Sequence, residues 1–308
     1  MIHVYIRGRL GNQLFQYAFV RMLQHHNPEV EVCWHWNDVL SQGKPEDGWI
    51  NSLSQFRTVD TKNTEKHPNL TLRQKVVMNV YWRFFPHNGT ILDKNKYQMR
   101  WAGVMAKFGL YYLDLGYYPF PKDLNDAGDL LISGNFESPQ YFNDIDEQLR
   151  EEIIPCNPLL VHNESLMHTI LTTNSVCISV RRGDFIDNSK FCQLLNICGK
   201  SYYDNAVAYI EKHVNNPTLI FFSDDIEWVR NNLKYNLPCY YECGTDPQWE
   251  KMRLMCSCRH FIIANSTFSW WAQHLCRFTE KIVVAPSRWY NSDFVPDLYE
   301  DNWVKIPV

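Results

Sequence analysis

The chain has 308 residues, of which 45% are hydrophobic, and its formal net charge is −4. This length and apolar content favour two globular domains and argue against disorder. The acidic balance argues against a protein that binds nucleic acid through a broad basic surface, but it leaves room for a local site that binds a small anion.

Ten cysteines occur without a CxxC pair or a spacing typical of zinc sites. Most lie in apolar segments, where a free thiol behaves as a small hydrophobic side chain, so we expect a reduced, cytoplasmic protein. Residues 1–6 are too short for the core of a signal peptide, and no segment is apolar for long enough to cross a membrane. Any contact with a membrane is therefore expected to be peripheral.

Residues 1–6 predict a strand, residues 7–13 a glycine-containing loop, and the residues from Leu14 to about His25 a helix. Two glycines three residues apart permit a tight turn, and the start of a helix offers free N–H groups to an anion or a hydroxyl. Asn12 and Gln13 can both donate and accept hydrogen bonds, which suits sugar hydroxyls as well as phosphates. An ordinary strand-to-helix turn with an Asn cap is the alternative.

Between residues 30 and 128 the pattern is less regular, with one credible helix at 70–85 that Pro86 ends. Its many aromatic residues suit either core packing or a platform for an acceptor sugar. The pattern of residues 129–136 then predicts a strand that ends at Gly134, and a helix is expected to run from Ser138 to Arg150. Glu137 lies at this junction, where it could cap the helix, orient an acceptor hydroxyl or serve as a base.

The pattern breaks at residues 155–158, which places a domain boundary between residues 1–157 and 158–308, with the last residues free to pack back on the first domain. The second half alternates regularly between helices and strands, which predicts a doubly wound parallel sheet. Right-handed crossovers would bring three polar strand ends to one edge of this sheet. These ends are residues 181–182, 223–225 and 265–267.

Each polar strand end has a chemical use and a plainer alternative. Arg181 and Arg182 suit a diphosphate, or they form a surface ion pair with a neighbouring carboxylate. Residues 265–267 open a helix whose N–H groups suit an anion, or they simply cap it. Asp224 and Asp225 could hold a divalent metal, accept N–H groups from a purine, or cap the following helix.

Five segments, in this order, resemble motifs of the α-1,2-fucosyltransferases of glycosyltransferase family 11. They are residues 8–17 (GRLGNQLFQY), 134–142 (GNFESPQYF), 180–185 (VRRGDF), 222–225 (FSDD) and 264–272 (ANSTFSWWA). The third resembles the HxRRxD motif of that family. Residues 30–127 have little to align with it.

The resemblance implies a GT-B-like architecture of two Rossmann-like domains facing a cleft, with an acceptor-binding N-terminal domain and a C-terminal domain that binds GDP-fucose. It also implies an inverting enzyme that needs no metal and no further cofactor. In related enzymes the position of Ser179 is a histidine that contacts guanine. Asp224 or Asp225 would therefore carry more of the base recognition in this chain.

The expected reaction is transfer of L-fucose from GDP-β-L-fucose to the 2-hydroxyl of a terminal galactose, on an oligosaccharide or a lipid-linked glycan of bacterial O-antigen type. The alternatives are another fucosyl linkage, a metal-dependent transferase that uses Asp224 and Asp225, and a non-catalytic nucleotide- or sugar-binding module. The expected catalytic residues are Arg181, Arg182, Asp184 and Asn12, with Asp184 either structural or catalytic. The expected donor-binding residues are Arg9, Gly11, Gln13, Ser179, Asp224, Asp225, Asn265, Ser266 and Thr267, and the acceptor-binding residues are Glu137 and Gln140.

Overall fold

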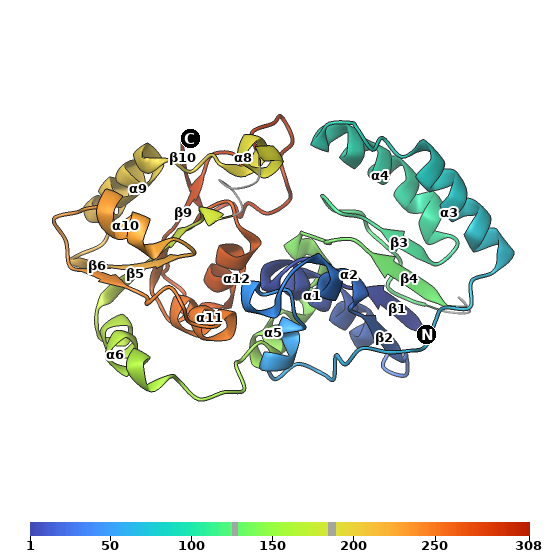
Figure 1. The fold of residues 1–308 in the computed structure, drawn as a ribbon, viewed down its shortest axis with the longest axis horizontal. Coiled ribbons are helices and arrows are strands. Elements are labelled where there is room, and N and C mark those ends of the chain that lie inside the picture. Colours follow the sequence, from blue (N-terminus) through green and yellow to red (C-terminus); the bar gives the residue numbers. More distant parts are fainter. Residues whose placement is uncertain (125–128, 184–188) are drawn as a thin grey trace. The chain divides into compact units, whose positions relative to one another are not determined.

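The computed structural model describes residues 1–124, 129–183 and 189–308, which form two compact units. The first unit contains Met1–Ile154 and Pro296–Leu298, and the second contains Pro155–Val295 and Tyr299–Val308. Each unit is built on its own parallel β-sheet with helices packed around it (Figure 1). The predicted α/β class and the parallel sheet of the C-terminal half are therefore confirmed.

The first unit has a four-stranded sheet in which every pairing is parallel. Its strand order is β2 (Val32–His35), β1 (Ile2–Tyr5), β4 (Leu130–Ser133) and β3 (Leu110–Tyr112). Helix α1 (Leu10–His26) follows β1 and is buried along most of its length because its apolar and aromatic side chains cover several faces of the helix. The sheet and this helix form the framework that positions residues 7–13.

Two predictions for the first unit needed correction. Helix α1 begins at Leu10, not Leu14, so Asn12 and Gln13 lie in its first turn instead of in a loop. The helix predicted from Ser138 to Arg150 is interrupted: two short 3₁₀ turns, Pro139–Tyr141 and Asn143–Ile145, precede α5 (Asp146–Glu152).

The region with a single predicted helix contains three α-helices among its described residues. Helix α3 (Leu72–Phe84) agrees with the prediction, whereas α2 (Asn37–Gln42) and α4 (Ile91–Ala106) were missed. Helix α4 starts with a capping box in which Thr90 and Asp93 bond reciprocally to each other's backbone N–H groups. The Thr90–Asp93 capping spacing is visible in the sequence, but the apolar residues of α4 follow the helical period too weakly to predict the helix.

The second unit has a six-stranded parallel sheet, as the alternating pattern predicted. Its order is β10 (Val304–Ile306), β9 (Val283–Pro286), β8 (His260–Ile262), β5 (Asn174–Val180), β6 (Pro217–Ser223) and β7 (Cys239–Tyr241). Strand β10 was not predicted. Its described α-helices are α6 (Glu164–Thr172), α8 (Ser189–Leu195), α9 (Lys200–His213), α10 (Ile226–Asn232), α11 (Gln248–Cys256) and α12 (Thr267–Leu275).

Strands β8, β5 and β6 are neighbours in the centre of this sheet, and the strand order reverses between β5 and β8. Open α/β sheets bind ligands beyond the carboxyl ends of their strands at such a reversal. All ten cysteines are free thiols. Among the residues that the structure describes, no helix has the length and apolar character needed to span a membrane.

Candidate functional site

The two arginines that follow β5 are each held by an aspartate that follows β6. Arg181 Nη1 lies 2.6 Å from Asp224 Oδ2, and the backbone N–H of Arg182 donates to Asp224 Oδ1 at 2.9 Å. Arg182 Nε donates to Asp225 Oδ2 at 3.1 Å, and its guanidinium lies over the ring of Trp228, 3.7 Å from the ring centroid. Both guanidinium groups are therefore fixed in position at the edge of the sheet.

This arrangement makes Asp224 and Asp225 the groups that orient the arginines. Asp225 also caps α10, because its Oδ1 accepts the backbone N–H of Trp228 at 3.1 Å. Helix capping was one of the predicted alternatives for this aspartate. A Cβ at Gly183 would lie 2.7 Å from Asp224 Oδ2, so a larger residue there would disturb the first ion pair. Both arginines and Asp224 are about three-quarters buried, which strengthens their interactions relative to fully exposed pairs.

The end of β8 lies beside the end of β5 and leads into α12. Ser266 is the N-cap residue of α12, and Ser266 and Thr267 are half-buried at the start of this nine-residue helix. The first N–H groups of a helix lack partners within the helix and suit an anion. Asn265 instead has a structural role: its buried amide donates to the carbonyl oxygens of Leu195 and Trp289.

Ser179 lies within β5, two residues before the arginine pair, and pairs with Phe222 of β6. It is buried, and its carbonyl oxygen accepts a hydrogen bond from the Tyr203 hydroxyl at 3.1 Å. Asp184, one of the predicted catalytic residues, lies outside the described residues.

A second polar constellation lies in the first unit, where the first turn of α1 meets the end of β4. Asn12 Nδ2 donates to Glu137 Oε1 at 3.0 Å, although the two residues are 125 positions apart. Glu137 is only 4% exposed. Burial, with a smaller contribution from the negative charge of Asp114, raises the pKa of Glu137 to about 8. A carboxyl group whose pKa lies near neutrality can exchange a proton with a substrate hydroxyl.

The backbone that carries Glu137 is held in an unusual conformation. Gly134 has a φ of +148°, and a Cβ there would lie 2.0 Å from the carbonyl oxygen of Leu113. Phe136 has a φ of +51°, although it is not a glycine. Its ring is stacked on Phe19 with the centroids 4.0 Å apart. Since strained backbone persists only where packing enforces it, this segment is built to fix Glu137 in place.

The remaining predicted residues of the first unit have different surroundings. Gln13 is fully buried and donates to the carbonyl oxygens of Gly8 and Ile50, which gives it a structural role. Arg9 is the N-cap residue of α1, with its guanidinium 5.7 Å from the ring centroid of Trp49. Gly11 is buried in the first turn of α1.

Gln140 lies three residues beyond Glu137 but belongs to a different set of contacts. Its amide donates to Asp297 Oδ2 at 2.7 Å, and Ser138 also bonds to this carboxylate. Asp297 belongs to the short segment Pro296–Leu298, which lies late in the sequence but packs with the first unit. Gln140 therefore attaches this returning segment while its own side chain stays exposed.

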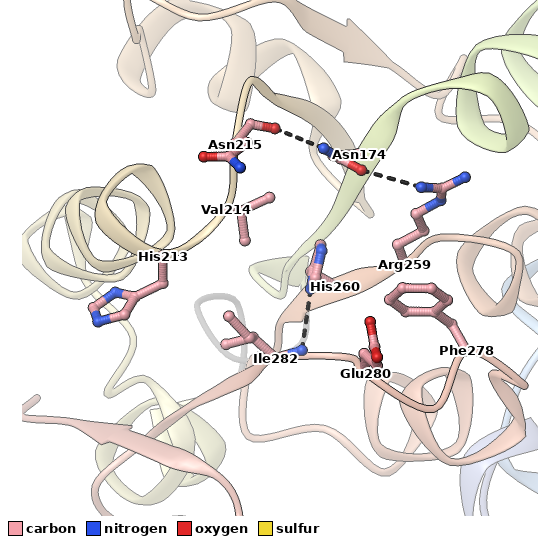
Figure 2. A pocket seen from close by; sticks show the side chains of 9 residues that line it. All are labelled: Asn174, His213, Val214, Asn215, Arg259, His260, Phe278, Glu280 and Ile282. Atoms are coloured by element: carbon pink, nitrogen blue, oxygen red, sulfur yellow. Dashed lines mark hydrogen bonds between the residues drawn. The ribbon is translucent and has the colours of Figure 1, made fainter.

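A hollow of about 350 Å³ lies at the opposite edge of the second unit's sheet, near the amino ends of β5 and β8 (Figure 2). Asn174 there bonds Arg259 and the carbonyl oxygen of Asn215. None of the residues predicted to act in catalysis or binding lines this hollow. We place the candidate site at the carboxyl edge, where the fixed charges are.

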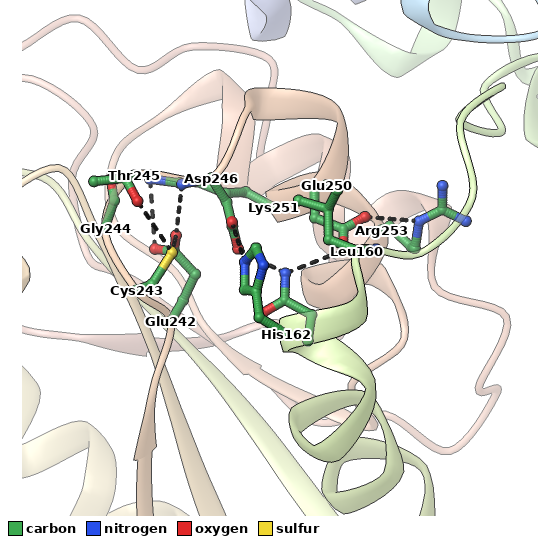
Figure 3. A network of polar contacts seen from close by, with 11 residues as sticks. Leu160, His162, Glu242, Cys243, Gly244, Thr245, Asp246, Glu250, Lys251 and Arg253 are labelled. Atoms are coloured by element: carbon green, nitrogen blue, oxygen red, sulfur yellow. Dashed lines mark hydrogen bonds and ion pairs between the residues drawn. The ribbon is translucent and has the colours of Figure 1, made fainter.

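A third polar cluster joins the segment before α6 to the start of α11 (Figure 3). His162 and Asn163 both bond the Asp246 carboxylate at 2.7 Å, and Glu250 accepts the backbone N–H of Leu160. Ligand atoms of His162, Cys243 and Asp246 lie within 4.8 Å of one another, a spacing that could hold a metal ion. Hydrogen bonds and ion pairs account for the Asp246 and Glu250 carboxylates, which anchor residues 160–163 beside the start of α11.

Sequence reasoning missed two supporting residues of the arginine site. Trp228 carries the Arg182 guanidinium, and Gly183 leaves room for Asp224. Trp228 follows Asp225 by three residues, the spacing at which a cap bonds the backbone, so the cap itself was predictable. The contact between the indole and Arg182 depends on how β5 and α10 pack.

Together, the two parallel sheets define a Rossmann-like α/β protein, and its charged strand ends could bind an anion. The family model for glycosyl transferase family 11 matches residues 127–307. This is more than half of the chain, so the chain belongs to that family and is a glycosyltransferase.

Two Escherichia coli proteins are similar over nearly the whole chain. The O-antigen biosynthesis glycosyltransferase WbnK is 28% identical, covering 98% of this chain and 99% of its own length. The α-1,2-colitosyltransferase is 27% identical, and the match covers 98% of this chain and 97% of that protein's length. The galactoside α-(1,2)-fucosyltransferase 1 of Saimiri sciureus is 25% identical over 50% of this chain and 45% of its own length.

Among solved structures, the fucosyltransferase NodZ from Bradyrhizobium aligns with 88% of this chain and 92% of its own. The identity is 11% and the TM-score 0.47, which is too weak a likeness to support conclusions about this chain.

Proposed function

We propose that this glycosyltransferase moves L-fucose from GDP-β-L-fucose to the 2-hydroxyl of a terminal galactose, with inversion at the anomeric carbon. The observation that carries the proposal is the pair of arginines fixed by Asp224 and Asp225 at the carboxyl ends of β5 and β6. Membership of family 11, and relatives whose names specify α-1,2 transfer, support the linkage.

In the proposed mechanism the second unit binds the diphosphate of the donor. As the bond from fucose to GDP lengthens, negative charge grows on the β-phosphate. Fixed donors stabilise that developing charge more than they stabilise the ground state. Arg181 and Arg182 supply two such donors, and the N-terminus of α12 with Ser266 and Thr267 supplies others. Because the ion pairs hold the guanidinium groups in place beforehand, little reorganisation is needed during the reaction.

The same carboxylates would limit the freedom of the arginines without removing their donors. A guanidinium group presents five N–H groups in a planar fork. Stacking on Trp228 orients the plane of Arg182, so that its fork can meet two phosphate oxygens together. Asp225 is the more exposed of the two aspartates and would be the better placed to accept N–H groups from guanine.

We assign the acceptor chemistry to Glu137 of the first unit. Its raised pKa, about 8, makes it a base of useful strength near neutral pH once it is ionised. Asn12 donates a hydrogen bond to one carboxyl oxygen and would orient the other toward the acceptor hydroxyl. Since the transition state resembles an oxocarbenium ion, a modest base suffices. We further propose that the reaction needs no metal.

A second candidate donor deserves direct comparison. One relative of similar length is an α-1,2-colitosyltransferase. Colitose differs from fucose by the absence of the 3-hydroxyl, so the two sugars would place the same groups at the reacting centre. GDP-colitose is therefore the alternative donor.

The test is to incubate the purified protein with labelled GDP-fucose or GDP-colitose and a panel of galactose-terminated acceptors, and to determine the linkage of each product. We expect α-1,2-linked fucose on galactose, with activity retained in the presence of a chelator. Preference for GDP-colitose would replace the donor assignment. A different linkage would overturn the assignment of the acceptor hydroxyl, and binding of GDP without transfer would mean a non-catalytic module.

A further inference from the structure

Helix α3 exposes a continuous line of apolar side chains on the first unit. Leu72, Val76, Val80 and Phe84 follow one another at intervals of four residues, so they share one face of the helix. Leu72 is 78% exposed, Val76 53% and Phe84 64%. Of the twelve large hydrophobic side chains that are exposed in the described part of the chain, six lie between residues 72 and 104. The exposure is thus concentrated in one place.

This exposure does not arise from a loosely packed helix. The opposite face of α3 is anchored by Tyr81, which is buried in a cluster with Met105, Leu110 and Leu131. The Tyr97 hydroxyl of α4 donates to the carbonyl oxygen of Tyr81 at 2.7 Å, and α3 and α4 run side by side (Figure 1). The helix is therefore fixed by one face while it presents the other face to its surroundings.

The same hairpin is strongly basic, although the whole chain is acidic. Residues 71–107 contain seven Lys or Arg residues and one acidic residue, a net charge of +6, so the remainder of the chain carries −10. Lys96, Arg100 and Lys107 are exposed along α4. On α3 itself, Arg73 and Arg83 are exposed beside the apolar line. An apolar face flanked by cations suits an interface between hydrocarbon and anionic head groups.

We propose that the apolar line of α3, with the basic face of α4, docks this protein onto the surface of a bilayer that contains anionic phospholipids. A helix of 13 residues is about 20 Å long, so it would lie in the plane of the head groups and would not cross the bilayer. This inference is independent of the donor and acceptor assigned above, because it concerns where the protein resides and not which sugar it transfers.

Charge decides between a bilayer and the other occupants of an apolar face. A second copy of this chain, related by two-fold symmetry, would bring one hairpin of net charge +6 against another and would be repelled. An anionic bilayer attracts each of these cations and accepts Leu72 and Phe84 at the same time. A purely polar polyanion would satisfy the cations but would leave the apolar line exposed.

The test is sedimentation of the full-length protein with vesicles of phosphatidylglycerol and phosphatidylethanolamine, compared with vesicles of phosphatidylcholine alone. We expect binding to the anionic vesicles that weakens as salt is added, because salt screens the basic residues. Each basic residue near an anionic surface contributes roughly fivefold to the partition coefficient, so reversing three of them should lower it by at least about 10²-fold.

Two variant sets separate the apolar and the charged contributions, and each has a matched control. The apolar set replaces the four residues of the α3 line with serine and should lower binding by at least about tenfold. The charge set changes three exposed basic residues of α4 to glutamate. The apolar controls are Val161→Ser, Leu171→Ser and Val295→Ser, and the charge controls are Lys44→Glu, Lys212→Glu and Lys234→Glu.

All substituted side chains are exposed, so folding is expected to survive and circular dichroism will verify it. Loss of vesicle binding in both test sets, with binding retained in both control sets, supports the proposal. Equal binding to phosphatidylcholine vesicles, or equal losses in test and control sets, overturns it. Dimerisation that the apolar set abolishes, without any vesicle binding, would mean that a second copy covers the face and would also overturn it.

Discussion

Replacing Glu137 with glutamine should raise the stability of the protein near neutral pH and lower its rate of transfer. The amide has the same shape as the carboxyl group and can still accept the hydrogen bond from Asn12, but it cannot ionise. The carboxyl group of Glu137 has an ordinary pKa of 4.5, and burial raises this to about 8 in the folded protein. The folded state therefore favours the protonated form and resists ionisation.

The sign of the effect follows from proton binding. Between pH 4.5 and about 8 the unfolded chain has released this proton while the folded chain retains it, so the free energy of unfolding falls as pH rises. Each pKa unit corresponds to about 1.4 kcal/mol, so at pH 7 the wild-type protein carries a penalty of about 3 kcal/mol that Glu137→Gln removes. Below pH 4.5 the two proteins should be equally stable.

The assay is urea denaturation of the full-length protein from pH 4 to pH 8.5, with transfer kinetics measured on the same preparations. We expect the stability advantage of the variant over the wild type to grow as pH rises, and its kcat to be about 10²–10⁴-fold lower, the usual contribution of a positioned base. The wild-type rate should increase with pH up to about 8, whereas the variant should show no such rise. Glu151→Gln, at an exposed position, is the control. Unchanged turnover, or a pH dependence of stability equal to that of the wild type, would refute the reasoning.

Three further predictions concern the arginine site, the strained backbone and a buried histidine pair. Arg182→Ala should lower kcat by about 10²–10³-fold by removing a charged donor from the leaving phosphate, and near-normal turnover in steady-state kinetics would contradict this role. Gly134→Ala should destabilise the first unit by about 3 kcal/mol or more in urea denaturation, because the new Cβ would collide with the carbonyl oxygen of Leu113; a change below about 1 kcal/mol would show that the backbone can relax. Burial, with a smaller effect of neighbouring His3, lowers the pKa of His35 to about 4 from 6.5. The stability this histidine provides is complete above pH 6.5 and should decline by about 1.4 kcal/mol per pH unit as pH falls toward 4, and His35→Gln should flatten that slope in denaturation curves.

The sheet of the second unit could be predicted because its signal is local and repeated. From β5 to β9 of that half, apolar strand segments alternate with helical patterns, and this alternation predicts parallel crossovers. The first unit was harder to predict because its chain between β2 and β4 contains helices with exposed apolar residues and partly buried polar ones. In α4, for example, Gln98 is buried whereas Val104 is exposed, so periodicity gave a weak signal.

Some features of the candidate site could also be predicted from local sequence, whereas others depend on contacts between distant segments. That Arg181 and Arg182 would stand at a strand end beside Asp224 could be predicted from the order of the strands. The sequence could not show that the aspartates would hold the arginines as separate ion pairs, or that Trp228 would lie beneath Arg182. These contacts depend on side-chain packing between elements more than 40 residues apart.

The sequence by itself determined the family motifs, the parallel architecture of the second half and the position of the arginine pair at a strand end, because all three follow from short stretches of chain. Only the tertiary structure decided that Glu137 is buried against Asn12 with a raised pKa. It also decided that the apolar line of α3 faces outward on a basic hairpin. Burial is the physical reason, since a side chain's exposure, and with it its charge state and its partners, is set by segments that are distant in sequence and adjacent in space.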